Sequence, residues 1–147
     1  LKLLTLLLPY CSKSSEQPQL QSEHTQKIKG VLEYIGLHYT ENISIESLAS
    51  SCYFSEYHFM RFFKKYVGMS CLDYIKSLRL QKAADLLEQQ ELSITDAAMT
   101  AGFSSLSYFY REFKKRYGTT PRQFIHSLPE RQHTNRTSTP GSPFSPL

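Results

Sequence analysis

The sequence has few of the features that mark secreted, metal-binding or β-sheet proteins. Its 147 residues include three cysteines, an odd number with no CxxC pair. A disulfide framework is therefore not expected, and the cysteine usage suits a reducing cytoplasm. The five histidines show no ligand spacing with cysteine, aspartate or glutamate, so we predict no metal site and no cofactor. No segment alternates apolar and polar residues with a period of two, which predicts that the chain forms no β-sheet.

Long apolar runs are also lacking. The most apolar segment, LKLLTLLLPY at residues 1–10, is too short to span a bilayer as a helix, and we expect no membrane association. It has one flanking lysine and no initiator methionine, so it matches a signal peptide poorly. We expect residues 1–22 to be the tail of an upstream effector-binding or dimerisation domain followed by a linker. Residues 129–147 are rich in proline, serine and threonine and are expected to be disordered.

Between these ends, apolar residues recur at helical spacing, and serine, glycine and proline mark the expected helix ends. Residues 23–128 are therefore predicted to form one all-α domain of about seven helices. The expected helices cover residues 25–39, a short segment after Ser44, residues 55–67, residues 71–89, a short segment after Ser93, residues 105–117 and a last turn through His126.

A pattern of apolar, basic and turn residues occurs twice in the chain. Ile45, Ala49 and Phe54 recur 49 residues later. Eight positions recur 50 residues later as identical or similar residues: Phe59, Arg61, Phe63, Lys64, Lys65, Gly68, Ser70 and Tyr74. The change of offset puts one extra residue in the second turn. Each copy contains a short helix, a turn and a basic amphipathic helix, as a helix-turn-helix DNA reader does. We therefore expect two helix-turn-helix subdomains joined by a linker helix at residues 71–89, roughly 27 Å long.

The basic faces of the two longer repeated helices are the candidate binding surface. The net charge of +4 points only weakly to a polyanionic partner, and a solvated helix face is the usual fate of a charge run. Duplication of the pattern favours nucleic acid. Successive major-groove segments on one face of B-DNA lie about 34 Å apart, and two helices so joined can enter both. Because the two helices differ in sequence, the predicted site is asymmetric.

Within each helix, residues of the first turns are expected near base edges and later basic residues near phosphates. Hydrophobic packing is an equal alternative for the tyrosine, methionine and leucine side chains. The predicted base contacts are Tyr57, Met60, Arg61, Leu106, Ser107, Tyr108 and Arg111, and the predicted phosphate contacts are Lys64, Lys65, Ser70, Lys114, Lys115, Arg116 and Arg122.

The second copy also resembles a known signature. The matching residues are Ile94-Thr95-Asp96-Ala97-Ala98, Gly102-Phe103, Ser107-Tyr108-Phe109, Arg111, Phe113-Lys114-Lys115, Gly118, Thr120-Pro121 and Phe124. Together they resemble the DNA-binding domain of the AraC/XylS family of bacterial transcription regulators. Leu78-Arg79-Leu80 resembles the linker helix of that family, and the resemblance covers about residues 25–127. Tyr53 departs from it, because the first turn often has glycine there; this leaves the geometry of that turn open.

The resemblance implies a seven-helix domain that binds double-stranded promoter DNA through two major-groove helices. It also implies an activator that works through RNA polymerase, in the bacterial cytoplasm at the nucleoid. Some DNA-repair methyl acceptors carry such a domain, but they need an activated cysteine beside a basic partner. Cys52 lies on an apolar helix face and Cys71 begins a helix without a nearby histidine, so we expect no enzymatic activity. A helical module that binds an acidic protein remains the other alternative.

Overall fold

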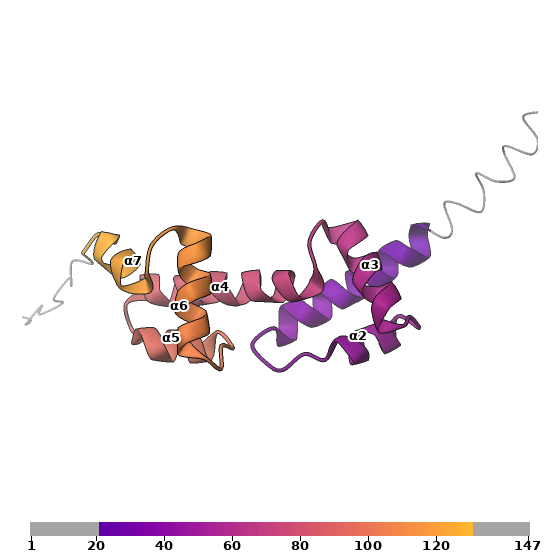
Figure 1. Cartoon of the computed structure of the whole chain (residues 1–147), viewed down its shortest axis with the longest axis horizontal. Helices are drawn as coiled ribbons and strands as arrows, with labels where there is room; N and C mark the ends of the chain where they lie inside the picture. Colours follow the sequence, from indigo (N-terminus) through magenta and orange to yellow (C-terminus); the bar gives the residue numbers. More distant parts are fainter. Residues whose placement is uncertain (1–20, 131–147) are drawn as a thin grey trace, which may run out of the picture.

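The computed structural model describes residues 21–130, and within this range it contains seven helices and no strand (Figure 1). The predicted all-α class is confirmed. None of these helices is long and apolar enough to cross a bilayer. The expected tails at residues 1–22 and 129–147 lie almost entirely outside the described residues. The helices are residues 21–38, α2 (Ile45–Ser51), α3 (Glu56–Val67), α4 (Cys71–Gln89), α5 (Ile94–Thr100), α6 (Leu106–Tyr117) and α7 (Pro121–Ser127).

The helix boundaries follow from caps that the sequence carries locally. Each helix from α2 to α7 begins after a serine or threonine whose hydroxyl accepts a hydrogen bond from the backbone amide three residues later. α3 and α6 both end at a glycine in the left-handed region, Gly68 (φ 90°) and Gly118 (φ 75°). Predicted and observed boundaries therefore agree closely. The capping residues are Ser44, Ser55, Ser70, Ser93, Ser105 and Thr120.

The first helix is already formed at residue 21, the first described residue, whereas its apolar pattern predicted a start at residue 25. Tertiary contacts hold this extra turn. The His24 ring packs edge-on against Phe62, with the ring centroids 5.4 Å apart, and its Nδ1 lies 3.0 Å from the Tyr66 hydroxyl. These contacts join residues about forty positions apart, and helical periodicity carries no information about them.

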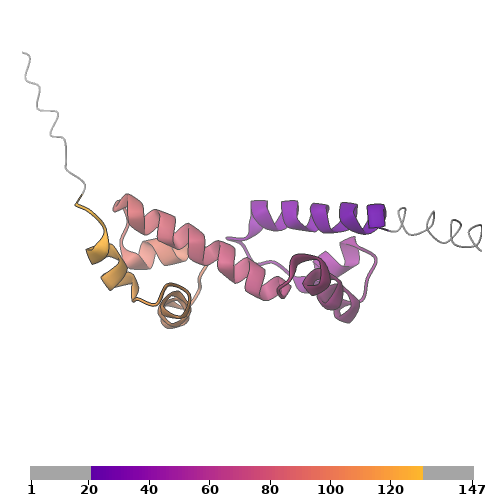
Figure 2. The same cartoon turned by 90° about the horizontal axis from the view of Figure 1, so that it is seen from above.

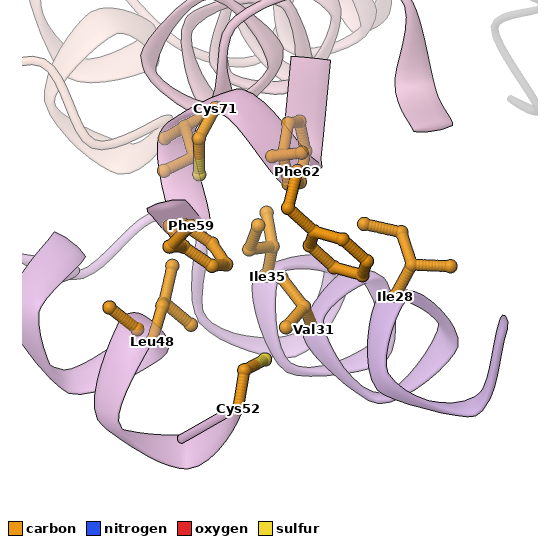
Figure 3. Packing of buried hydrophobic residues seen from close by; sticks show 11 residues of the cluster. Ile28, Val31, Ile35, Leu48, Cys52, Phe59, Phe62 and Cys71 are labelled. Atoms are coloured by element: carbon orange, nitrogen blue, oxygen red, sulfur yellow. The ribbon is translucent and has the colours of Figure 1, made fainter. Parts of the chain in front are cut away.

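The fold consists of two helical units at the two ends of α4 (Figures 1 and 2). The first core lies between the helix at residues 21–38, α2, α3 and the first turns of α4. Figure 3 shows Ile28, Val31 and Ile35 of the first helix facing Phe59 and Phe62 of α3. The second core lies between the later turns of α4, α5 and α6, with α7 packed against it. Because α4 contributes side chains to both cores, it connects the two units rigidly.

A second connection between the units lies at the middle of α4. Arg79 Nε donates to the Tyr39 carbonyl oxygen at 2.6 Å, and its Nη2 donates to the Glu41 carbonyl oxygen at 2.8 Å. Gly102, in the turn of the second unit, lies against the same loop. A Cβ on Gly102 would be 2.9 Å from both Thr40 Cα and the Thr40 carbonyl oxygen, and 3.0 Å from Arg79 Nε. The loop of the first unit, the linker helix and the turn of the second unit thus meet at one point, which we call the Arg79 junction.

The two turns between the short and long helices share one backbone feature. Tyr53 has φ 59° and its counterpart Gly102 has φ 104°, so both lie in the left-handed region. The first turn therefore keeps the expected geometry without glycine, and the Tyr53 side chain is 92% exposed. The extra residue predicted in the second turn is confirmed, because four residues separate α2 from α3 and five separate α5 from α6.

The Arg79 junction predicts unequal effects of alanine at two glycines. Gly118→Ala places a Cβ in open space at φ +75°, and the left-handed backbone alone should cost about 1–2 kcal/mol. Gly102→Ala adds a clash with the Thr40 backbone and should cost about 2–5 kcal/mol in total. Urea unfolding of both variants measures this difference. Equal losses would show that Gly102 has room for a side chain and that the two units do not meet there.

Tyr53 predicts a stabilising substitution. Its side chain contributes little burial, while its backbone conformation disfavours any residue with a Cβ. We expect Tyr53→Gly to raise the free energy of unfolding by about 0.5–1 kcal/mol, the left-handed strain less the extra chain entropy of glycine. Tyr53→Ala is the matched control, since it removes the same ring but keeps the Cβ, and it should bring no gain. A loss of stability in Tyr53→Gly would mean that the exposed ring makes a stabilising contact.

Candidate nucleic-acid interface

α3 and α6 each bury one face and expose the other. Phe59 and Phe63 of α3, like Phe109 and Phe113 of α6, are fully buried in their respective cores. The two helices stand upright in Figure 1, and both are seen nearly end-on in Figure 2, near the same edge of the molecule. Their axes therefore run in similar directions, and the molecule offers two similarly oriented basic helices along one side of α4.

On each helix, an exposed arginine lies against an exposed tyrosine. In α3, Arg61 Nη1 lies 3.5 Å from the Tyr57 hydroxyl, and its guanidinium carbon lies 5.7 Å from the Tyr57 ring centroid. In α6, the Arg111 guanidinium carbon lies 5.4 Å from the Tyr108 ring centroid. The Tyr57 residue is 73% exposed, and the Arg111 side chain is 71% exposed. The structure thus brings together four of the predicted base-contact residues in two similar tyrosine–arginine pairs.

The two pairs are built from different positions. The tyrosine precedes the arginine by four residues in α3 and by three in α6, and the repeat aligns Tyr57 with Ser107, not with Tyr108. Residues three and four apart both lie on one face of a helix, so either spacing allows the contact. Sequence reasoning selected these residues separately and did not predict their pairing.

Three other predicted base-contact residues differ in exposure. Ser107 is exposed on the first turn of α6. Met60 is half-buried and packs against the first core, and Leu106 is half-buried and packs against the second. The packing role weighed for Met60 and Leu106 therefore exists, and part of each side chain remains accessible.

The predicted phosphate contacts are mostly exposed cations in the last turns of the two helices. Lys64 and Lys65 of α3, and the three cations at positions 114–116 of α6, are all exposed. Cations at these positions also complement the helix dipole, so their placement alone does not require an anionic partner. Arg122 is exposed on α7. Ser70 differs from the rest: it is half-buried, and its hydroxyl accepts a hydrogen bond from the Asp73 amide as the cap of α4.

A buried carboxylate beside Arg111 is the feature that sequence reasoning missed. Glu112 is 9% exposed, and its Oε2 lies 3.1 Å from Lys76 Nζ of α4. Lys76 Nζ also lies 3.3 Å from Asp73 Oδ1, while Glu112 Oε1 lies 3.9 Å from Arg111 Nε. Burial opposes the charged form of Lys76, but hydrogen bonds with Glu112 and Asp73 outweigh it and raise the pKa of this lysine. The sequence did contain one indication of this site, because the second copy has a glutamate at the position where the first copy has Phe62.

Comparison with known proteins places this geometry in a family. Residues 48–127, more than half of the chain, match the family described as "Helix-turn-helix domain". Among curated relatives, the chain is 32% identical over 125 residues to the regulatory protein PocR of Salmonella typhimurium, covering 85% of this chain and 41% of PocR. It is 39% identical over 94 residues to the bifunctional transcriptional activator/DNA repair enzyme AdaA of Bacillus subtilis, covering 64% and 44%. The chain thus spans less than half the length of either relative.

Solved structures share the fold. An AraC-type DNA-binding-domain regulator from Chromobacterium violaceum superposes with a TM-score of 0.62 at 27% identity, covering 69% of this chain and 91% of that one. The DNA-binding domain of the global transcriptional factor AdpA, solved in complex with a target DNA, superposes with a TM-score of 0.63 at 26% identity, covering 67% and 89%. The duplicated helix-turn-helix, the linker helix and these likenesses agree: the chain belongs to the AraC/XylS family of transcription regulators and carries the helix-turn-helix DNA-binding domain of that family.

Proposed function

We propose that this domain, residues 23–128, reads one double-stranded DNA site by placing α3 and α6 in successive major grooves. The observation that carries the proposal is the exposed tyrosine–arginine pair that recurs on two similarly directed helices. α4 has 19 residues, which corresponds to about 28 Å. Adjacent major grooves on one face of B-DNA are about 34 Å apart. The linker helix and the widths of the two units can therefore supply the required separation.

The chemistry of the exposed residues supports different roles along each helix. Arg61 and Arg111 can donate two hydrogen bonds to the O6 and N7 acceptors of guanine, and apolar side chains beside them can pack on thymine methyl groups. The lysines and arginine in the later turns neutralise phosphates, which makes affinity depend steeply on salt. Hydrogen bonds to phosphates position the protein, and contacts with base edges give it sequence preference.

The DNA site should be asymmetric. The first turn of α3 begins Glu56-Tyr57-His58, whereas that of α6 begins Leu106-Ser107-Tyr108. A symmetric dimer reads a palindrome because its two recognition helices are identical. Here two different helices belong to one chain, so a single copy reads two different half-sites.

At the level of the whole protein, we propose a transcription activator that acts through RNA polymerase and carries an effector-binding or dimerisation domain upstream. The chain matches less than half of PocR, whose name describes it as a regulatory protein, and of AdaA, whose name includes transcriptional activator. A DNA-reading domain of this size leaves room in such relatives for a separate sensing domain.

The name of AdaA also includes DNA repair, but the cysteines described here do not support that chemistry. Cys52 and Cys71 are both buried in the first core. Burial raises the pKa of the Cys71 thiol to about 11, so this thiol stays protonated at neutral pH. A methyl acceptor needs an accessible thiolate. We therefore propose a non-enzymatic role for the domain; Cys11 lies outside the described residues.

Selection of bound fragments from random double-stranded DNA tests the proposal. We expect the wild-type chain to enrich one asymmetric site with two short conserved segments about one helical turn apart. Retention of all fragments alike, without an enriched sequence, would contradict sequence-specific reading. It would favour a basic helical module that binds an acidic protein instead.

Arg111→Ala tests the base-reading role within that site. We expect binding to the selected site to weaken by about 1–3 kcal/mol, and preference at one base position to be lost. Lys115→Ala is the matched control, because it removes a cation from the same helix. It should weaken binding to selected and random DNA alike and reduce the salt dependence by about one phosphate contact. Equal weakening by Arg111→Ala on selected and random DNA would assign this arginine to a phosphate.

A further inference from the structure

One position that the repeat aligns, residue 62 in α3 and residue 112 in α6, makes a different kind of contact in each helix. In α3 the position holds Phe62, which is buried and packs against His24 of the first helix and against Tyr66, with ring centroids 5.4 and 4.9 Å apart. In α6 the position holds Glu112, whose carboxylate pairs with Lys76 of α4 at 3.1 Å. The first unit therefore has an aromatic contact at this position, and the second unit has an ion pair.

The residues that face this position also differ in part between the two units. If the offset of 49 residues is extended to the first helix, His24 corresponds to Asp73, whereas Lys27 corresponds to an identical residue, Lys76. In the first unit, Lys27 Nζ lies 4.7 Å from the Phe54 ring centroid. In the second unit, Lys76 instead contacts Asp73 and Glu112. A buried ion pair is seldom more stabilising than an apolar contact of similar size, because both charges lose their hydration. Stability alone therefore gives no reason for the glutamate.

The contact of the second carboxylate oxygen of Glu112 with Arg111 suggests a role other than stability. Oε2 is held by Lys76, and Oε1 lies 3.9 Å from Nε of Arg111. The same guanidinium lies over the face of the Tyr108 ring. The carboxylate therefore lies near Nε of Arg111, and among residues 21–130 no hydrogen bond from the two terminal nitrogens of Arg111 is found. Those two nitrogens can form a bidentate contact with the O6 and N7 of guanine. Arg61 of α3 also lies against a tyrosine, Tyr57, but the residue that follows it is Phe62, which has no carboxylate.

We propose that Glu112, held by Lys76, is a positioning residue that orients Arg111 toward a base edge and thereby sets base preference in the second half-site. This inference rests on the proposed DNA-reading function. A side chain held in its binding conformation loses less entropy when it binds. The negative carboxylate also disfavours a phosphate at the same edge of the guanidinium, which directs Arg111 to the bases.

Glu112→Gln tests the inference, because it keeps the shape of the side chain and removes its charge. Binding is measured on the site selected by the wild-type chain and on every single-base variant of that site. At the position that Arg111→Ala relaxes, we expect Glu112→Gln to reduce discrimination about fivefold or more, the lower end of what one good arginine–base contact provides. The position that Arg61→Ala relaxes should keep its preference. In an Arg111→Ala background, Glu112→Gln should change discrimination no further.

Two further variants separate orientation from packing. Glu88→Gln on exposed α4 surface makes the same change of charge and should leave discrimination at every position unaltered. The double variant Glu112→Phe with Lys76→Met gives this contact the apolar character of the first unit, which keeps the test available if Glu112→Gln folds poorly. It should fold, and it should still lack the base preference that depends on Arg111. Wild-type discrimination in this double variant would overturn the inference.

Other outcomes are also decisive. If Glu112→Gln weakens binding to all sequences by one common factor, Glu112 is structural and the inference is wrong. The same holds if its effect on discrimination persists without Arg111. If Arg111→Ala relaxes a base position and Glu112→Gln does not, only the role of Glu112 fails. If Arg111→Ala relaxes no position, the proposed function of α6 fails and the inference fails with it.

Discussion

The Arg79 junction is the constraint on which the arrangement of the two units depends. One guanidinium from the middle of α4 binds the carbonyl oxygens of Tyr39 and Glu41, just after the first helix ends. Gly102 brings the turn of the second unit against the same loop. Hydrogen bonds from a charged donor contribute about 1.5–3 kcal/mol each, and the close backbone contact leaves no room for sliding. The two exposed basic helices, α3 and α6, would otherwise be connected only by α4, and this junction fixes their relative orientation.

The two units contain the same sequence of helices and turn, but different side-chain contacts hold the long helix of each unit in place. Each has a short capped helix, a left-handed turn and a long helix that buries phenylalanines and exposes a tyrosine–arginine pair. The first unit anchors its long helix with aromatic contacts around Phe62, and the second with the Glu112–Lys76 ion pair. The shared arrangement supports the proposal that both helices contact DNA, and the different anchors and first turns are the basis for expecting different base preferences.

Capping residues and helical periodicity predicted most of the fold. They did not predict the contacts between residues far apart in the sequence. Capping serines and terminal glycines fix helix ends within a few residues of chain, so the seven helices, the repeat and the extra turn residue were predictable. The Arg79 hydrogen bonds join residues 38 and 40 positions apart, and Lys76 meets Glu112 across two helices. Helical periodicity says nothing about such pairs. Helical periodicity placed Arg111 on the exposed face of its helix, but it did not show that the Glu112 carboxylate lies close to the guanidinium.

The most direct measurement of the central claim is affinity for the selected site as base pairs are inserted between its two half-sites. Each added base pair moves one half-site by about 3.4 Å and turns it by about 35° around the DNA axis. A rigid Arg79 junction predicts that one inserted base pair already weakens binding at least about tenfold, and that five inserted pairs leave only nonspecific binding. Affinity that stays unchanged from zero to five inserted pairs would show that the two units move independently, and would contradict this account.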